Sequence, residues 1–181
     1  MGLGILKFKF NNFLWIIVIG MMAMIVSFVF FMTLIYNATK ENEQLTFDSI
    51  DMVSYGFMVS KASDYLTAQA RVYAATGNKE YYDNYWNEVN NNKTRDKAID
   101  ALIKLKIPAN ILSYAEQAKN SSDSLIKLEE ASFEAVAAGD LQKATQIMSS
   151  KEYESGKVKI SAFLTTFENE IKAFSSAEAK K

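Results

Sequence analysis

The sequence predicts an all-α fold: an antiparallel up-down-up-down four-helix bundle whose first helix continues from an N-terminal transmembrane helix. Two observations lead to this prediction. Apolar residues recur at spacings of three and four along most of the chain, which is the repeat of an amphipathic helix. The 181 residues also include only one proline and seven glycines, so few positions interrupt a helix. Long helices joined by short turns pack antiparallel around one core.

Residues 13–36 are predicted to form the transmembrane helix. They contain no charged residue and no proline. A helix of this length reaches about 36 Å, which exceeds the roughly 30 Å of a bilayer's hydrocarbon core. A removed signal peptide is the alternative, but its apolar region is usually shorter and a small-residue cleavage site would follow. We therefore expect a retained single-pass anchor.

The flanks of this segment predict its orientation. Lys7 and Lys9 precede it and no acidic residue does, so residues 1–12 are expected to remain cytoplasmic. Trp15 and Tyr36 are placed to lie at the two membrane interfaces. Residues 37–181 are then the extracytoplasmic domain of a protein of the inner (plasma) membrane.

The first helix of the domain is expected to run on from the membrane segment and to end at Gly77-Asn78, a helix C-terminal pattern. Its buried face is predicted from residues that alternate spacings of three and four. These are Met52, Tyr55, Val59, Ala62, Leu66, Gln69 and Tyr73.

Two more helices are expected between Lys79 and Gly139. The second begins near Lys79 and ends by Lys106, although the polar run at 90–93 weakens its pattern. The third begins with Pro108, a residue that suits the first turn of a helix, and ends at Gly139. Its predicted buried face consists of Ile111, Ala115, Ala118, Ser122, Leu125, Leu128, Ser132 and Ala135.

The fourth helix is expected to begin after the capping residue Asp140 and to break around Ser149 and Ser150. Beyond the break the chain has its clearest amphipathic stripe. The stripe consists of Ile160, Phe163, Leu164, Phe167, Ile171 and Phe174.

The composition argues against several classes of function. There is no cysteine and no histidine, which removes thiol chemistry, the commonest general base and the commonest transition-metal ligand. No convergent set of carboxylates has the spacing of a metal site, and no basic block suits nucleic acid. We expect a non-enzymatic protein with no catalytic residue, no metal, no cofactor and no nucleic-acid partner.

Five stretches in order carry a resemblance to a known family. They are LTAQARVYAATG at 66–77, EYYDNYWNE at 80–88, SLIKLEEA at 124–131, AAGDLQKA at 137–144 and SSKEYESGK at 149–157. Over nearly all of residues 1–175 the chain resembles the sensory region of bacterial methyl-accepting chemotaxis proteins, an N-terminal transmembrane helix plus a four-helix-bundle ligand-binding domain. Similar modules precede some diguanylate cyclases and histidine kinases.

The resemblance implies a sensory receptor domain that passes a ligand-induced helix displacement across the membrane. It implies a small-molecule ligand, anionic in many such receptors, or a ligand-loaded binding protein as partner, besides membrane lipid. It also implies a parallel homodimer, in which we expect Phe57, Met58 or Tyr65 to meet a second copy.

Receptors of this type continue into a second span, a HAMP linker and a cytoplasmic signalling hairpin. We therefore expect residues 1–181 to be the N-terminal portion of a longer receptor. A free-standing anchored scaffold that binds another envelope protein is the alternative.

The predicted ligand site consists of Arg71, Tyr73, Tyr85 and Trp86. Such receptors capture ligands at the membrane-distal end of the bundle, and an arginine can grip a carboxylate in bidentate fashion. The alternative for Arg71 is a surface ion pair with a glutamate on a neighbouring helix. The alternative for the aromatic residues, with Tyr81 and Tyr82, is core packing.

Two further polar groups are expected to be structural. Tyr153 lies at the predicted break in the fourth helix, where it is expected to hydrogen-bond across the break. Lys127, Glu129 and Glu130 are expected to form a solvated face.

Overall fold

The computed structural model describes residues 2–179, and their side chains from residue 13 onward. The predicted all-α class is confirmed, because the described residues form helices and no strand. In chain order the elements are α1 (Gly2–Thr76), α2 (Lys79–Asn87), the π-helix η1 (Glu88–Asn92), α3 (Thr94–Lys104), α4 (Ala109–Asp123), α5 (Ile126–Ala137), α6 (Leu141–Met148) and α7 (Lys151–Glu178). The chain divides into two units, Met1–Leu45 and Thr46–Lys181. The side chains of Lys7 and Lys9, on which the predicted orientation rests, lie outside the described ones.

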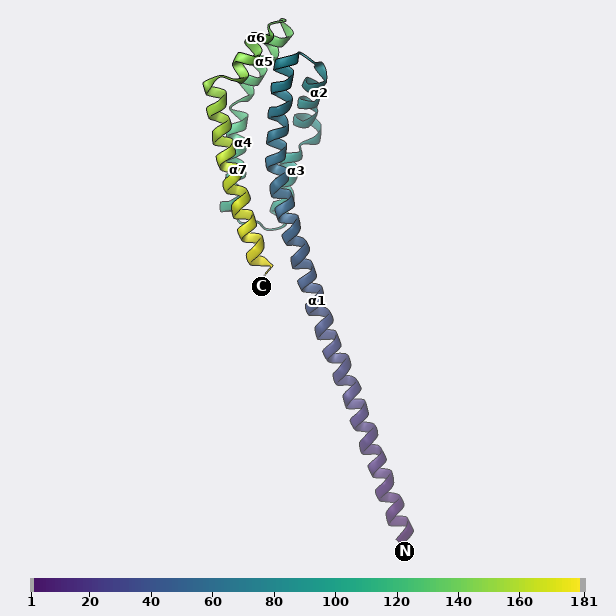
Figure 1. The fold of residues 1–181 in the computed structure, drawn as a ribbon. Helices are drawn as coiled ribbons and strands as arrows, with labels where there is room; N and C mark the ends of the chain where they lie inside the picture. Colours follow the sequence, from purple (N-terminus) through teal and green to yellow (C-terminus); the bar gives the residue numbers. More distant parts are fainter. Residues whose placement is uncertain (1, 180–181) are drawn as a thin grey trace. The chain divides into compact units, whose positions relative to one another are not determined.

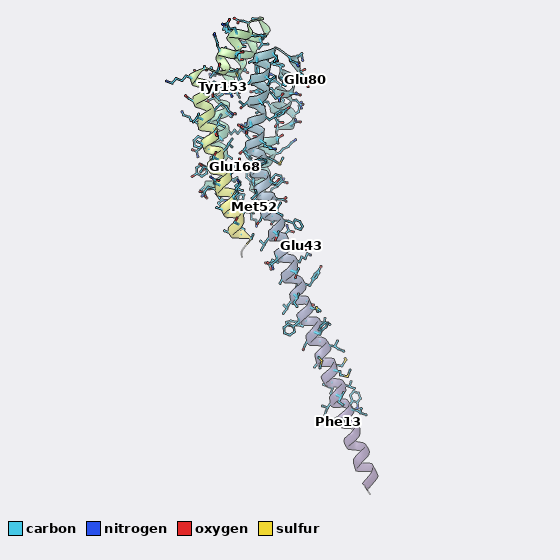
Figure 2. All side chains as sticks on the ribbon, viewed as in Figure 1. Phe13, Glu43, Met52, Glu80, Tyr153 and Glu168 are labelled. Carbon is cyan, nitrogen blue, oxygen red and sulfur yellow. The ribbon has the colours of Figure 1, made fainter. Side chains whose placement is uncertain are left out.

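The first unit contains the apolar segment. Every side chain from residue 13 to residue 36 is exposed, and Figure 2 shows these side chains, Phe13 among them, projecting on all sides of the helix. Within the described residues this is the one helix that is long and apolar enough to cross a membrane. A core helix of a soluble domain would instead bury most of such side chains.

In the second unit, residues 46–76 of α1 lie antiparallel to α7, and Figure 1 shows the two helices side by side. At one end, Ser49 and Ser175 each donate their hydroxyl to the other's backbone carbonyl, over 3.1 and 2.8 Å. At the other end, Arg71 pairs with Glu154. A side-chain carbon on Gly56 would lie 3.0 Å from Ile171, so this glycine lets the two helices approach closely.

The predicted buried stripes of these two helices are confirmed. On α1, Met52, Val59, Ala62 and Tyr73 are buried, and the other stripe positions are half-buried. Within the α7 stripe, Ile160, Leu164, Phe167 and Ile171 are buried, while Phe163 and Phe174 are half-buried against the core. Spacings of three and four keep such residues on one face of a helix.

The prediction of one continuous second helix is wrong. The chain forms α2, then one wide turn of π-helix at η1, and then α3. Lys93 takes a left-handed conformation with φ of 50°, and the carboxylate of Glu88 accepts the backbone N–H of Thr94 at 2.8 Å. Asparagine side chains compete with helical hydrogen bonds, which explains why the helix changes form within the run at 90–92.

The third predicted helix is also divided, into α4 and α5, and Pro108 is the N-cap of α4 and not its first residue. The break falls at Ser124 and Leu125. The Ser124 hydroxyl donates to the carbonyl of Ser121, an alternative to helical pairing. At this break the Leu125 side chain is buried beside Gly156 of α7. A Cβ added to Gly156 would lie 2.6 Å from the leucine side chain.

The predicted turns and caps are found where the sequence places them. Gly77 and Gly139 follow helices with φ of 66° and 81°, a conformation that favours glycine. The Asp140 carboxylate accepts the backbone N–H of Lys143 at the start of α6. Ser150 caps α7 in the same way, through the N–H of Tyr153, so the predicted break in the fourth helix is confirmed.

Candidate functional site

A buried carboxylate lies at the centre of the second unit. Glu129 on α5 is 7% exposed, and both of its oxygens accept hydrogen bonds from tyrosines. The Tyr85 hydroxyl on α2 donates to it at 2.5 Å, and the Tyr153 hydroxyl on α7 donates at 2.8 Å. Both tyrosines are themselves buried. One acidic side chain thus links three helices.

The predicted solvated face is therefore wrong for Glu129 and right for Lys127 and Glu130, which are exposed. The sequence contained a signal for this. Leu125, Glu129 and Ser132 are spaced by four and three, so they share one face of a helix, and all three are buried.

Burial controls the electrostatics of this centre. It raises the pKa of Glu129 above its ordinary value, while the two tyrosine hydroxyls and the nearby Lys157 oppose that rise. Burial, followed by the charge of Glu129, raises the pKa of Tyr85 and of Tyr153. Both tyrosines therefore stay protonated and remain donors to the carboxylate.

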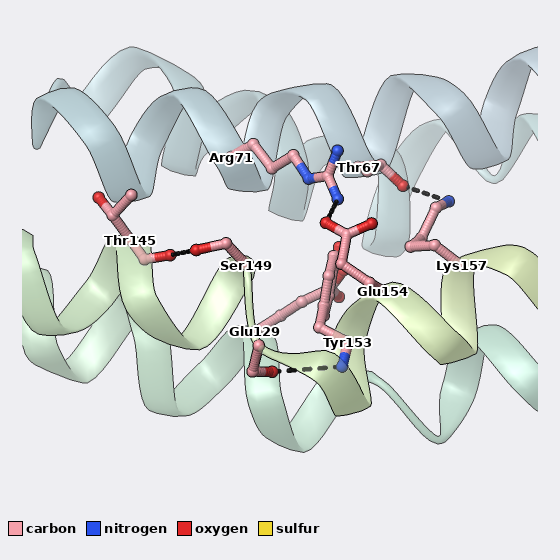
Figure 3. A network of polar contacts seen from close by, with 9 residues as sticks. Thr67, Arg71, Glu129, Thr145, Ser149, Tyr153, Glu154 and Lys157 are labelled. Carbon is pink, nitrogen blue, oxygen red and sulfur yellow. Dashed lines mark hydrogen bonds and ion pairs between the residues drawn. The ribbon is translucent and has the colours of Figure 1, made fainter.

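Lys157 on α7 is a cation whose charge acts on this carboxylate. Its ammonium group donates to the Thr67 hydroxyl on α1 at 2.6 Å, as Figure 3 shows. Burial lowers the pKa of Lys157, although Asp64 and Glu129 act in the opposite direction. The lysine is thus a partly desolvated cation held between α1 and α7.

A cavity of about 140 Å³ opens beside Glu129 and Lys157. Its wall is formed by residues of α1, α2, η1, α3, α4, α5 and α7, and it includes the hydroxyl-bearing residues Ser63, Thr67 and Ser122. Charges of both signs line it, among them Arg95 and Asp123, whose closest charged atoms are 3.6 Å apart. The cavity thus offers hydrogen-bond donors and acceptors together with two kinds of charge.

The predicted site residues divide into two groups. Tyr73, Tyr85 and Trp86 lie together, because their rings pack around Phe133 at centroid distances of 5.2 to 6.5 Å. Tyr82 joins them, at 5.2 Å from Tyr73 and 6.3 Å from Trp86. Phe133 is the member that sequence reasoning missed.

Arg71 belongs to a different group. Its guanidinium pairs with Glu154 and lies over the ring of Tyr153, 5.5 Å from the centroid. Figure 3 shows the side chain reaching across from α1 to α7. With 43% of its side chain exposed, Arg71 makes the surface ion pair that was the alternative to ligand binding.

Among the described residues, no group of three or more acidic side chains is arranged to hold a metal ion. No family model, curated protein or solved structure matches the chain.

The Glu129 carboxyl is expected to make the stability of the domain depend on pH. Its pKa is raised in the folded state, so the folded protein binds the proton more tightly than the unfolded chain does. The contribution of this proton to folding stability is fully present below the pKa of the unfolded state, about 4.5. It is lost as pH rises through the higher pKa of the folded state. Chemical unfolding followed by circular dichroism across this range should show stability falling with pH.

Glu129→Gln, which cannot ionise, provides the control for this dependence. The component of the pH profile that belongs to Glu129 should be absent from the variant. If the profiles of the two proteins are parallel throughout, the carboxyl does not titrate differently in the folded and unfolded states.

Proposed function

We propose that residues 37–181 are the extracytoplasmic sensory domain of a membrane-bound bacterial signal-transduction receptor, most closely a methyl-accepting chemotaxis protein. The observation that carries the proposal is the polar cavity beside Glu129. Charged groups are costly to bury, and a cavity walled by them inside a helical domain suits a small polar ligand. The apolar segment at residues 13–36 supplies the anchor.

Four helical segments of the second unit support the proposed bundle. They are residues 46–76 of α1, then α2 to α3, then α4 and α5, then α6 and α7. Neighbouring segments run antiparallel. Tyr73 and Tyr82 meet across the first turn, and Lys119 of α4 reaches Asp96 of α3 at 3.1 Å. Tyr153 of α7 reaches Glu129 of α5 across the last turn.

Signal transmission follows from which helices line the cavity. Thr67 belongs to α1 and Lys157 to α7, and both contribute to its wall. A ligand that binds one relative position of these helices more tightly than another shifts the population toward that position. The helix α1 extends from Gly2 to Thr76, so the apolar segment and the cavity wall share one element.

The lining favours a ligand with charges of both signs, such as a small amino acid. The lysine and arginine side chains of the wall complement a carboxylate, and Glu129 complements an ammonium group. An amino acid carries a carboxylate, as the predicted anionic ligand does. In this cavity the carboxylate would lie by Lys157 and Arg95, and not by Arg71.

A thermal-shift screen of the full chain in detergent, against amino acids and dicarboxylates, tests the proposal. A compound that binds the folded state at 100 times its Kd adds about 2.7 kcal/mol to the stability, so the melting temperature rises. Ser122→Leu fills part of the cavity and should abolish the shift. The matched control is Ser113→Leu on the same helix, outside the cavity wall. If no compound acts, or if Ser122→Leu keeps the full shift, the cavity is not a ligand site and the scaffold alternative gains weight.

A reporter fused after Lys181 should behave as an extracytoplasmic protein. Only the segment at residues 13–36 separates it from Lys7 and Lys9, which favour the cytoplasmic side. Fusions to alkaline phosphatase, active only outside the cytoplasm, and to β-galactosidase, active only inside it, give opposite readings. Active β-galactosidase at this position would contradict the orientation.

Single cysteines at Ile50, Phe57 and Lys61 should form disulfide-linked dimers in membranes. All three positions are exposed and fall on one face of α1, so a parallel second copy would bring each next to its equivalent. Asp51 is exposed but lies about 100° around the helix from Ile50, and a cysteine there should crosslink much less. Equal crosslinking at all four positions, or at none, would count against a specific dimer.

A further inference from the structure

A second recess, separate from the cavity beside Glu129, lies over the aromatic cluster. It is an open groove of about 460 Å³ between α2 and α5, and Tyr73 of α1 also contributes to its lining. Four aromatic residues line it: Tyr73, Tyr82, Trp86 and Phe133. A volume of this order accommodates a small organic ligand.

The charged residues that line the groove are both acidic. Glu130 and Glu134 line it from consecutive turns of α5, and both are exposed. Neither carboxylate makes an ion pair with a lysine or arginine within the described part of the chain. Carboxylates beside aromatic faces attract a cation by two routes, because the face of an aromatic ring is itself negative.

Trp86, one of the residues that line the groove, carries an unused donor. The indole N–H of Trp86 is buried and makes no hydrogen bond within the described residues. Most buried donors are paired, so an unpaired one needs an explanation. This donor is enclosed by the protein, so the groove offers a ligand ring surface and carboxylates and not this N–H group.

We propose that the groove formed by Tyr73, Tyr82, Trp86, Phe133, Glu130 and Glu134 binds a small quaternary ammonium cation of the choline type. A methylated ammonium group is apolar enough to contact ring faces and keeps a positive charge that ring faces and carboxylates both stabilise. The ligand differs in charge from the one expected at Arg71. It also occupies a site other than the cavity, so the inference goes beyond the proposed function.

Tryptophan fluorescence measures this binding directly. The chain has two tryptophans, and Trp15→Phe leaves Trp86 as the sole reporter in the full chain. In maltoside detergent free of choline lipids, tetramethylammonium chloride should change the Trp86 emission to saturation. Sodium chloride at equal concentration controls for ionic strength. Tert-butanol, a neutral molecule of similar shape, should bind about tenfold more weakly or not at all.

Two variants of this reporter protein test the two routes of attraction. Glu130→Gln with Glu134→Gln should weaken tetramethylammonium binding about tenfold, because both carboxylates become neutral. Glu116→Gln with Glu170→Gln removes the same net charge from exposed sites on α4 and α7 and should leave binding unchanged. Tyr82→Leu should also weaken binding about tenfold, whereas Tyr65→Leu on the exposed face of α1 should not.

Far-UV circular dichroism of each variant is the control for folding, and only folded variants are compared. The inference is overturned if the Trp86 signal does not saturate, if tert-butanol binds as well as tetramethylammonium, or if the Glu130 and Glu134 double variant binds normally. The cavity variant Ser122→Leu should keep tetramethylammonium binding. A loss of amino-acid sensing in Ser122→Leu therefore bears on the proposed function and not on the groove.

Discussion

Replacing Glu129 with alanine is expected to lower the free energy of unfolding of the domain by about 2 to 5 kcal/mol. The change removes the acceptor of two buried tyrosine hydroxyls at once. Each buried polar group left without a partner costs about 1 to 3 kcal/mol. In a domain of this size the loss corresponds to a fall in melting temperature of about 7 to 16 °C. Thermal and urea unfolding of the full chain in detergent measure it.

Two substitutions separate the effect of the hydrogen bonds from that of the charge. Glu129→Gln keeps the size and one acceptor oxygen, so it should cost less than half as much as the alanine variant. Glu130→Ala changes the exposed neighbour and should alter stability by no more than about 0.5 kcal/mol. A Glu129→Ala variant as stable as Glu130→Ala would show that the tyrosines find other partners.

Replacing Phe167 with alanine is expected to cost about 3 to 5 kcal/mol, the usual range for a buried phenylalanine. This ring is fully buried and lies on the α7 face that packs into the core. Alanine would leave a cavity that rigid neighbouring helices cannot close. Since small domains are stable by about 5 to 15 kcal/mol, the variant should be close to unfolding at 37 °C.

Phe47→Ala provides the matched comparison, because this phenylalanine lies on α1 and is 56% exposed. It should change the stability of the monomer by about 0.5 kcal/mol or less. If both phenylalanine variants lose equal stability, Phe47 is covered by a partner under the conditions used, which dimer crosslinking would then show.

The sequence was most informative about where helices end. Glycine at Gly77 and Gly139 and the caps Asp140 and Ser150 act locally, so their effect can be read from a few residues. The long stripes of α1 and α7 were equally clear, because a periodic pattern over many turns leaves little ambiguity. The divisions at η1 and at Ser124 were missed, since asparagine and serine side chains weaken a helix locally but do not end it as reliably as proline or glycine.

The candidate site could be predicted only in part. The aromatic residues Tyr73, Tyr85 and Trp86 were expected together and lie together, because the Gly77 turn brings the two helices back alongside each other. Arg71 was grouped with them by sequence position, but its side chain faces α7. Glu129 was assigned to solvent because isolated charged residues are rarely buried, and its two tyrosine partners lie 44 and 24 positions away.

The reciprocal bonds between Ser49 and Ser175 limit how far α1 and α7 can slide past each other. The same two residues supply both donors and both acceptors, so the bonds form or break together. A slide of half a helical turn, about 2.7 Å, would stretch both beyond hydrogen-bonding distance. Losing both costs about 1 kcal/mol for each bond. A change of register between α1 and α7 must therefore overcome about 2 kcal/mol at this end of the helix pair.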